Sequence, residues 1–144
     1  MDDYTVVREL LCAGADGAPA IGAPERATLD YAGLRALADV TVARLNELGV
    51  GRNDRVAIVL PNSPEMAAAF VTIACGATTA PLNPAYRQEE FDFYLADLKA
   101  KALVIEQGSE SPALTGAAER NIPVLTLVAD ETGPAGNFTL AGEG

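Results

Sequence analysis

The chain has 144 residues, 20 of them acidic and 10 basic, and contains no histidine, so its formal net charge is −10. An acidic chain with two lysines has no basic surface for nucleic acid, and without histidine it has neither an imidazole metal ligand nor a Ser-His or Cys-His nucleophile. It contains no uninterrupted apolar run of about 18 residues and begins with acidic residues, so we expect a cytoplasmic domain without a membrane span.

The first thirty residues are predicted to contain a short helix and a small hairpin. Residues 5–13 carry apolar side chains at helical spacing. A Gly- and Pro-rich stretch follows, in which residues 20–21 can pair with residues 27–29 across a turn at 24–26.

A long amphipathic helix comes next. Asp30 is a suitable N-cap, because its carboxylate can accept a hydrogen bond from an amide of the first turn. Apolar residues from Leu34 to Leu48 recur at helical spacing and form one continuous face. Gly49 is placed to end the helix in the left-handed conformation.

Residues 55–60 form a continuous apolar run rich in Val and Ile, which predicts a strand covered on both faces. Ser63 and Pro64 then suit the N-cap and first position of a helix. Residues 66–75 are apolar or small, so we expect this helix to be buried on nearly all sides, and Gly76 to end it.

Strands and helices continue to alternate as far as residue 128. The predicted elements are a short strand over 78–82, a helix over 88–98, a strand over 102–105, a helix from Ser111-Pro112 to about 120, and a strand over 124–128. Pro81 must lie at a strand end or in an edge strand. This order predicts an α/β fold with an open, mostly parallel sheet flanked by helices on both faces. Residues 130–144 lack periodicity, so we expect a domain over 1–129 and a loop-like tail over 130–144.

Two strand exits carry the candidate site residues. In open α/β sheets ligands collect at the carboxyl ends of the strands. Asn62 and Ser63 follow the first buried strand, and Asn83 to Tyr86 follow the next strand. We take Asn62, Asn83 and Tyr86 as candidates for facing a ligand. The same residue types also make turns and helix caps, so a purely structural role is the alternative.

The other reactive side chains have structural interpretations. Glu89, Glu90 and Asp92 diverge around a helix, so we expect a solvated first turn and no metal site. Cys12 and Cys75 lack a C-x-x-C spacing and lie among small or apolar residues, which is typical of buried thiols in a reducing compartment. The chain also lacks both a G-x-G-x-x-G fingerprint and a Walker loop.

An ordered series of segments resembles the N-terminal part of the adenylate-forming enzymes, which include the acyl-CoA synthetases, the luciferases and the peptide-synthetase adenylation domains. The segments are 29–34, 54–65, 76–77, 81–86 and 100–103. Two residues depart from the family pattern and weaken helix starts. Gly33 stands where the family usually has Glu, and Arg87 stands where Thr or Ser is common.

The resemblance implies the family's N-terminal α/β subdomain and, for the complete enzyme, a need for ATP, Mg²⁺ and coenzyme A. In that reaction a carboxylate attacks the α-phosphate of ATP to give an acyl-adenylate, and the coenzyme A thiol then displaces AMP. The family's phosphate-binding loop and catalytic lysine have no counterpart here. We therefore assign no catalytic or metal-binding residue and expect neither activity nor a bound cofactor for this chain alone.

Under this resemblance Asn62, Asn83 and Tyr86 become candidates for facing the substrate or coenzyme A. The sequence of residues 89–95 is similar to that of ligases for short or dicarboxylic acids such as oxalate. The resemblance implies a small-molecule carboxylate of this kind as the substrate of the complete enzyme.

We expect the chain to be the N-terminal part of a longer carboxylate–CoA ligase, with the remaining domains as its partners. Apolar faces left exposed in the isolated chain would favour self-association. The alternative is a stand-alone binding or interaction module that keeps the fold without the chemistry and binds coenzyme A or an adenylate by itself. A flavodoxin-like regulatory domain is disfavoured, because no acidic cluster follows the first strand.

Overall fold

The centre of the molecule is a five-stranded sheet in the order β4-β3-β5-β6-β7. Its strands are β3 (Arg55–Val59), β4 (Thr78–Pro81), β5 (Ala102–Glu106), β6 (Val124–Ala129) and β7 (Phe138–Ala141). The first four strands in this order are parallel, and β7 is antiparallel to β6. This arrangement confirms the predicted mostly parallel sheet, with β4 at an edge. The structure is a computed structural model that describes Leu11 and residues 14–142.

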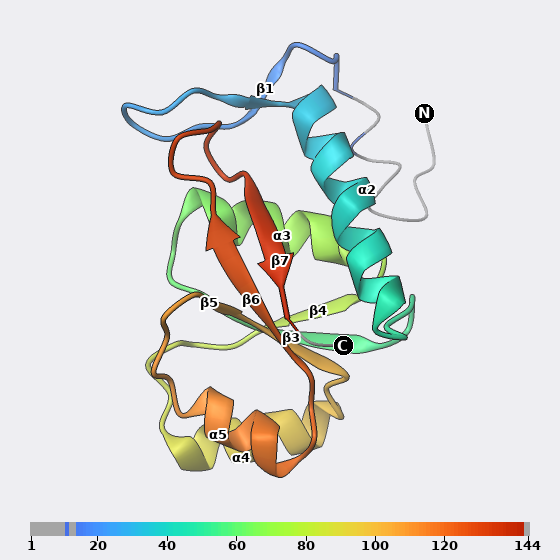
Figure 1. The fold of residues 1–144 in the computed structure, drawn as a ribbon, viewed down its shortest axis with the longest axis vertical. Helices are drawn as coiled ribbons and strands as arrows, with labels where there is room; N and C mark the ends of the chain where they lie inside the picture. The colour runs from blue at the N-terminus through green and yellow to red at the C-terminus, as the bar shows by residue number, and fades with distance from the viewer. Residues whose placement is uncertain (1–10, 12–13, 143–144) are drawn as a thin grey trace.

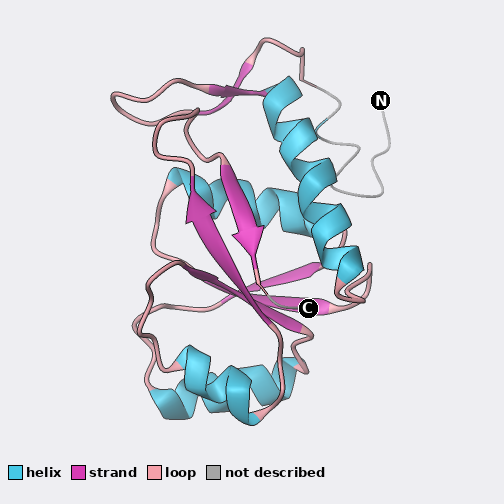
Figure 2. Ribbon diagram, viewed as in Figure 1, coloured by secondary structure: helices cyan, strands magenta, loops and turns pink. Residues whose placement is uncertain are grey.

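Helices cover both faces of the sheet (Figure 1). The helices α2 (Tyr31–Glu47) and α3 (Pro64–Ala74) lie on one side, and α4 (Gln88–Leu98) and α5 (Ala113–Glu119) lie on the other, as Figure 2 shows. The predicted α/β class with two helical layers is thus confirmed. Within the described part of the chain, no helix is long and apolar enough to cross a membrane.

A two-stranded antiparallel hairpin, β1 (Pro19–Ile21) and β2 (Leu29–Asp30), lies apart from the main sheet beside the first turn of α2 (Figure 1). A hairpin was predicted here, but its second strand is residues 29–30 rather than 27–29, with Pro19 opposite Asp30 and Ile21 opposite Leu29. The predicted helix over 5–13 lies outside the described residues except for Leu11, which is helical and buried. Cys12 lies outside them as well.

Strand β3 shows why an uninterrupted apolar run was required. Val56 and Ile58 pack into the core beneath α2 and α3, whereas Ala57 and Val59 pack into the core beneath α4 and α5. All four side chains are at most 3% exposed. Because successive side chains of a strand point to opposite faces, a strand with a core on each side has no position for a polar residue.

The predicted helix caps are present. The Asp30 carboxylate accepts a hydrogen bond from the Gly33 amide at 2.8 Å, and the Ser63 hydroxyl accepts one from the Met66 amide at 3.0 Å. Gly49 has a φ of 79° just after α2, which is the left-handed conformation predicted for it. Local signals therefore set the beginnings of α2 and α3.

The expectation that α3 is buried on nearly all sides is wrong. Ala68, Ala69 and Ile73 are fully buried against the sheet side, but Ala67 is exposed and Phe70 is 42% exposed. A helix in the outer layer of this fold has the sheet on one side and a neighbouring helix on another, so the rest of its apolar surface has nothing to cover it within the described chain.

The expectation of a loop over all of 130–144 is also wrong, because residues 138–141 form β7. This strand pairs with β6, with Phe138 opposite Ala129 and Leu140 opposite Leu127. Phe138 is buried in the core. A strand of four residues takes its stability from cross-strand pairing and burial, and neither is visible in its own short pattern.

Gly136 provides a test of the hairpin that joins β6 to β7. Its φ is 86°, and a Cβ at this position would lie 2.9 Å from the carbonyl oxygen of Pro64. We expect Gly136→Ala to lower the free energy of unfolding by about 1–3 kcal/mol, because both the backbone conformation and the contact disfavour a side chain. Urea denaturation of the purified variants measures this change.

Gly17→Ala is the matched control, since a Cβ there meets nothing within 4 Å. We expect it to change the free energy of unfolding by less than about 0.5 kcal/mol. Equal losses in the two variants would show that the hairpin does not need glycine at position 136.

Candidate functional site

Two hollows lie at the carboxyl ends of the parallel strands. The first, which we call the carboxyl-end groove, has a volume of about 590 Å³ and is lined by residues that follow β3, β5 and β6. The second, which we call the Asn62–Asn83 pocket, has a volume of about 540 Å³ and lies between the ends of β3 and β4. Leu60 lines both. This edge is where an open parallel sheet places its ligands.

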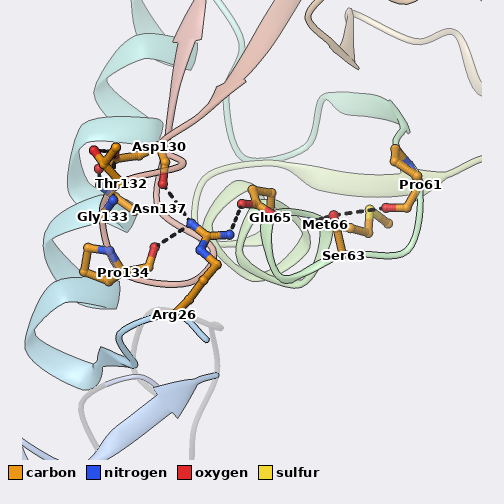
Figure 3. A network of polar contacts seen from close by, with 10 residues as sticks. All are labelled: Arg26, Pro61, Ser63, Glu65, Met66, Asp130, Thr132, Gly133, Pro134 and Asn137. Atoms are coloured by element: carbon orange, nitrogen blue, oxygen red, sulfur yellow. Dashed lines mark hydrogen bonds and ion pairs between the residues drawn. The ribbon is translucent and has the colours of Figure 1, made fainter. Parts of the chain in front are cut away.

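The wall of the carboxyl-end groove is held by the guanidinium of Arg26 (Figure 3). One terminal nitrogen donates to Glu65 Oε1 at 2.7 Å, and the other donates to the carbonyl oxygens of Asp130 at 2.8 Å and Pro134 at 3.1 Å. Arg26 thereby joins the β1–β2 turn, the first turn of α3 and the β6–β7 hairpin. We call this set of contacts the Arg26 clamp.

Charge sets what the groove can bind. Glu65 is only 9% exposed and is neutralised by Arg26, whereas Glu106 and Glu131 also line the groove and are exposed. The one cation among the lining residues is therefore already paired, and the surrounding carboxylates repel a polyphosphate. Among the described residues no group of three or more His, Cys, Asp or Glu side chains can hold a metal ion. These residues by themselves do not fit Mg²⁺ and ATP.

Asp130 organises the hairpin loop beside the clamp. Its carboxylate accepts hydrogen bonds from Asn137 Nδ2 at 3.0 Å, from the Gly133 amide at 3.1 Å and from the Thr132 hydroxyl at 3.3 Å. The hydrogen bond from Asn137 is the main reason that the pKa of the Asp130 carboxyl lies below its ordinary value. The hydrogen bonds of the folded hairpin therefore stabilise the ionised form of the Asp130 carboxyl.

The structure brings together two of the three sequence-predicted site residues. Asn62 and Asn83 are exposed and line the Asn62–Asn83 pocket with Met66 and Leu82. The Asn83 side chain also accepts a hydrogen bond from the Ala85 amide at 2.9 Å. That contact gives Asn83 the structural role in a turn that was the alternative interpretation, without removing its side chain from the pocket.

Tyr86 does not join them. Its ring stacks on Tyr94 with centroids 5.2 Å apart and meets Phe91 edge-on at 5.8 Å, so it packs against α4 and lines neither hollow. A hydrogen bond with the Tyr94 hydroxyl, followed by charge repulsion from the same group, raises the pKa of Tyr86. The described contacts of its ring are thus with aromatic side chains of α4.

The acidic cluster on α4 has structural partners. Glu89 and Glu90 are exposed in the first turn, as predicted, and Glu90 Oε1 accepts a hydrogen bond from the Arg87 amide at 3.1 Å. Asp92 pairs with Arg120 of the next helical segment at 3.0 Å. Arg87 thus begins the helix through its amide, although it lacks the hydroxyl that usually caps this position.

Sequence reasoning missed Arg26 as a site residue. It appeared only as part of the turn at 24–26, and its acceptor Asp130 is 104 residues away. A single arginine between a glutamate and an alanine carries no local signal for such a contact. The clamp becomes visible only when the fold places the turn beside the hairpin.

Comparisons with known proteins identify relatives. A family model described as AMP-binding enzyme matches residues 11–142. The oxalate–CoA ligase of Arabidopsis thaliana is 36% identical over 107 residues, which are 73% of this chain and 21% of that protein. The protein named "Probable CoA ligase CCL9" from Humulus lupulus is 37% identical over 114 residues, which are 78% of this chain and 21% of that protein. The chain thus spans about a fifth of the length of these curated relatives.

Solved structures share the fold. The apo structure of MatB from Rhodopseudomonas palustris has a TM-score of 0.74 at 23% identity, and the match covers 96% of this chain and 30% of MatB. CmiS6 also has a TM-score of 0.74, at 21% identity, with 99% of this chain and 34% of CmiS6 covered.

The contacts of the Arg26 clamp predict that removing the guanidinium destabilises the fold. We expect Arg26→Met to lower the free energy of unfolding by about 2 kcal/mol, because it leaves a largely buried carboxylate unpaired; partial exposure keeps the loss below that of a fully buried pair. Lys101→Met is the control, since Lys101 is half exposed and 3.8 Å from Asp54, and should cost less than about 0.5 kcal/mol.

Adding Glu65→Gln to the Arg26→Met variant should recover part of the loss, since the buried group then carries no charge. Chemical denaturation of the four proteins completes the double-mutant cycle. If the losses of unfolding free energy in Arg26→Met and Glu65→Gln simply add in the double variant, the ion pair is not the source of the stability.

Asp130 predicts a pH dependence. Because its folded-state pKa is lowered, ionised Asp130 stabilises the fold above the ordinary aspartate pKa of about 3.9, and this contribution is lost as the pH falls through the lower folded value. We expect Asp130→Asn to be less stable than the native chain at pH 6, with the difference shrinking at acidic pH. Urea denaturation at several pH values measures it, and a pH-independent difference would contradict the assignment.

Proposed function

The chain belongs to the family of AMP-binding enzymes, and we propose that it forms the N-terminal part of a carboxylate–CoA ligase. The observation that carries the proposal is the family match over nearly the whole chain, together with CoA ligases among its relatives at 36–37% identity. The proposal includes a cytoplasmic location, where such an enzyme meets ATP and coenzyme A.

In the proposed reaction a carboxylate oxygen of the acid attacks the α-phosphorus of ATP, forming the acyl–AMP anhydride and releasing pyrophosphate. The sulfur of coenzyme A then attacks the acyl carbon, forming the thioester and releasing AMP. Mg²⁺ would neutralise charge on the phosphates. Because the carboxyl-end groove is acidic and its one arginine is paired, we assign the binding of ATP to the remainder of the enzyme.

The role proposed for this chain is to form one wall of the substrate or coenzyme A site. Asn62 and Asn83 expose amide groups in one pocket at the carboxyl edge of the sheet, and amides can donate and accept hydrogen bonds with a polar ligand. The Arg26 clamp keeps the neighbouring wall in place. Tyr86, which packs on α4, is left out of this site.

We propose a short dicarboxylic acid such as oxalate as the first substrate class to test. Residues 89–95 resemble ligases for such acids, and an oxalate–CoA ligase is among the relatives at 36% identity over 73% of this chain. The chemistry requires an acid with one carboxylate free to attack the α-phosphorus, and a second carboxylate adds a charge that a site can recognise.

The test uses the protein expressed to the end of its reading frame. We expect it to release pyrophosphate and AMP in the presence of ATP, Mg²⁺, coenzyme A and oxalate, and to form a thioester detectable by mass spectrometry. The 144-residue chain alone should form none, because the described residues that line its two hollows include no unpaired cation to hold the phosphates. A panel of monocarboxylic acids is tested in parallel. Thioester formation with one of these acids but not with oxalate would support the ligase reaction and contradict only the proposed substrate class.

Two results would contradict the proposal. One is a reading frame that stops after Gly144, and the other is an extended protein that adenylates no acid. Calorimetry of the 144-residue chain with coenzyme A separates the alternative of a stand-alone binding module, since tight binding by this chain alone would favour that module.

A further inference from the structure

The turn that leads into β1 places an aspartate directly before a glycine. The Ala18 amide donates to the carbonyl oxygen of Ala15 at 3.0 Å, so Asp16 and Gly17 are the two central residues of a β-turn. Both residues are exposed, and the side chain of Asp16 is 85% exposed. In the sequence of 144 residues, Asp16 is the only Asp or Asn that precedes a glycine.

The two groups of this dipeptide that can react with each other are unobstructed. A Cβ at position 17 would meet nothing within 4 Å, so the approach to the Gly17 amide nitrogen is open. None of the described residues accepts a hydrogen bond from this amide. At every other Asp the following residue carries a side chain, which hinders the same approach. The Gly17 nitrogen can therefore reach Cγ of Asp16 and close a five-membered ring.

We propose that Asp16 is a site of spontaneous isomerisation to isoaspartate and that Arg35 restrains the reaction. The Gly17 nitrogen attacks Cγ of the protonated Asp16 carboxyl and loses its proton, the bond from Cγ to the hydroxyl oxygen breaks, and water leaves. The product is a cyclic imide, which water then opens. Cleavage between the nitrogen and Cγ restores aspartate, whereas cleavage between the nitrogen and the former main-chain carbonyl carbon gives isoaspartate. Water is the only co-reactant, and the isomer has the mass and charge of the original chain.

Arg35 of α2 binds the carboxylate that has to react. One terminal nitrogen of its guanidinium donates to Asp16 Oδ1, and the other donates to the carbonyl oxygens of Leu11 at 2.9 Å and Gly14 at 3.0 Å. The Arg35 side chain is only 15% exposed, so these contacts fix its position. To react, the Asp16 carboxyl must give up this charge-assisted hydrogen bond and take up a proton. The ion pair thus opposes ring closure without covering the site.

Isomerisation would alter the contact between this turn and the start of α2. The carbonyl oxygen of Asp16 accepts a hydrogen bond from the Ala32 amide at 3.1 Å. Isoaspartate lengthens the main chain by one carbon and converts this carbonyl into a free carboxylate. It also consumes the side-chain carboxylate that pairs with Arg35. We therefore expect the isomer to unfold at a lower temperature than the original chain.

Ageing of the full chain tests the proposal. The protein expressed to the end of its reading frame is kept in warm neutral buffer for several weeks. Peptide mapping by mass spectrometry with electron-transfer fragmentation then locates isoaspartate, and methyl transfer by a protein-isoaspartate methyltransferase quantifies it. Asp97 is the internal control, because it is exposed on α4 but is followed by Leu98. The readout does not depend on ligase activity, so a failure of the proposed function leaves this test intact.

We expect isoaspartate to form at Asp16 at least about tenfold faster than at Asp97. Gly17→Ala should slow the reaction at Asp16 at least about fivefold, since the added Cβ hinders the amide nitrogen while the fold has room for it. Asp16→Glu keeps a carboxylate but would have to close a larger ring, so it should form no isomer at this position. Absence of isoaspartate at Asp16 in the native protein would overturn the proposal, whether or not the chain unfolded in urea forms it.

Two substitutions of Arg35 test its role. Arg35→Met should raise the rate at Asp16 at least about threefold, whereas Arg35→Lys, which keeps a cation beside the carboxylate, should raise it less. A rise confined to Asp16 is the expected result. An unchanged rate, or an equal rise at Asp97 that reports general loosening of the fold, would overturn the role assigned to Arg35.

Discussion

The guanidinium of Arg26 holds together three segments that are distant in the sequence: the β1–β2 turn, the start of α3 and the β6–β7 hairpin. Glu65 can occupy its nearly buried position in the first turn of α3 because this cation neutralises it, and the positive end of the helix dipole acts in the same direction. The hairpin in turn packs Gly136 against Pro64 and buries Phe138. The wall of the carboxyl-end groove depends on this one side chain.

The layered arrangement explains why the candidate site lies next to the exposed side of α3. The sheet buries both of its faces, so α3 has one apolar side against the core and another that no described element covers. The strand ends that carry Asn62 and Asn83 lie next to the start of this helix. A polar pocket at the rim of an apolar face is the arrangement expected where two parts of an enzyme enclose a ligand.

How well the sequence predicted each feature depended on how local its cause is. The strands β3 and β5 and the caps Asp30 and Ser63 were predicted because the signal lies within a few residues of the element. Asn62 and Asn83 were placed together by the rule that parallel strands end at one edge. The same rule grouped Tyr86 with the two asparagines. It could not show that the Tyr86 ring packs against Phe91 and Tyr94 of α4, because those contacts form only in the folded structure.

The sequence by itself determined the order of strands and helices between residues 30 and 128, the α/β class and the resemblance to the family, since hydrophobic periodicity and turn residues act over short distances. Only the tertiary structure decided that residues 138–141 form a strand, that Arg26 pairs with Glu65, and that one side of α3 stays exposed. Periodicity shows which side of an element is apolar but not which element covers it. Contacts between residues tens of positions apart arise only when packing brings them together.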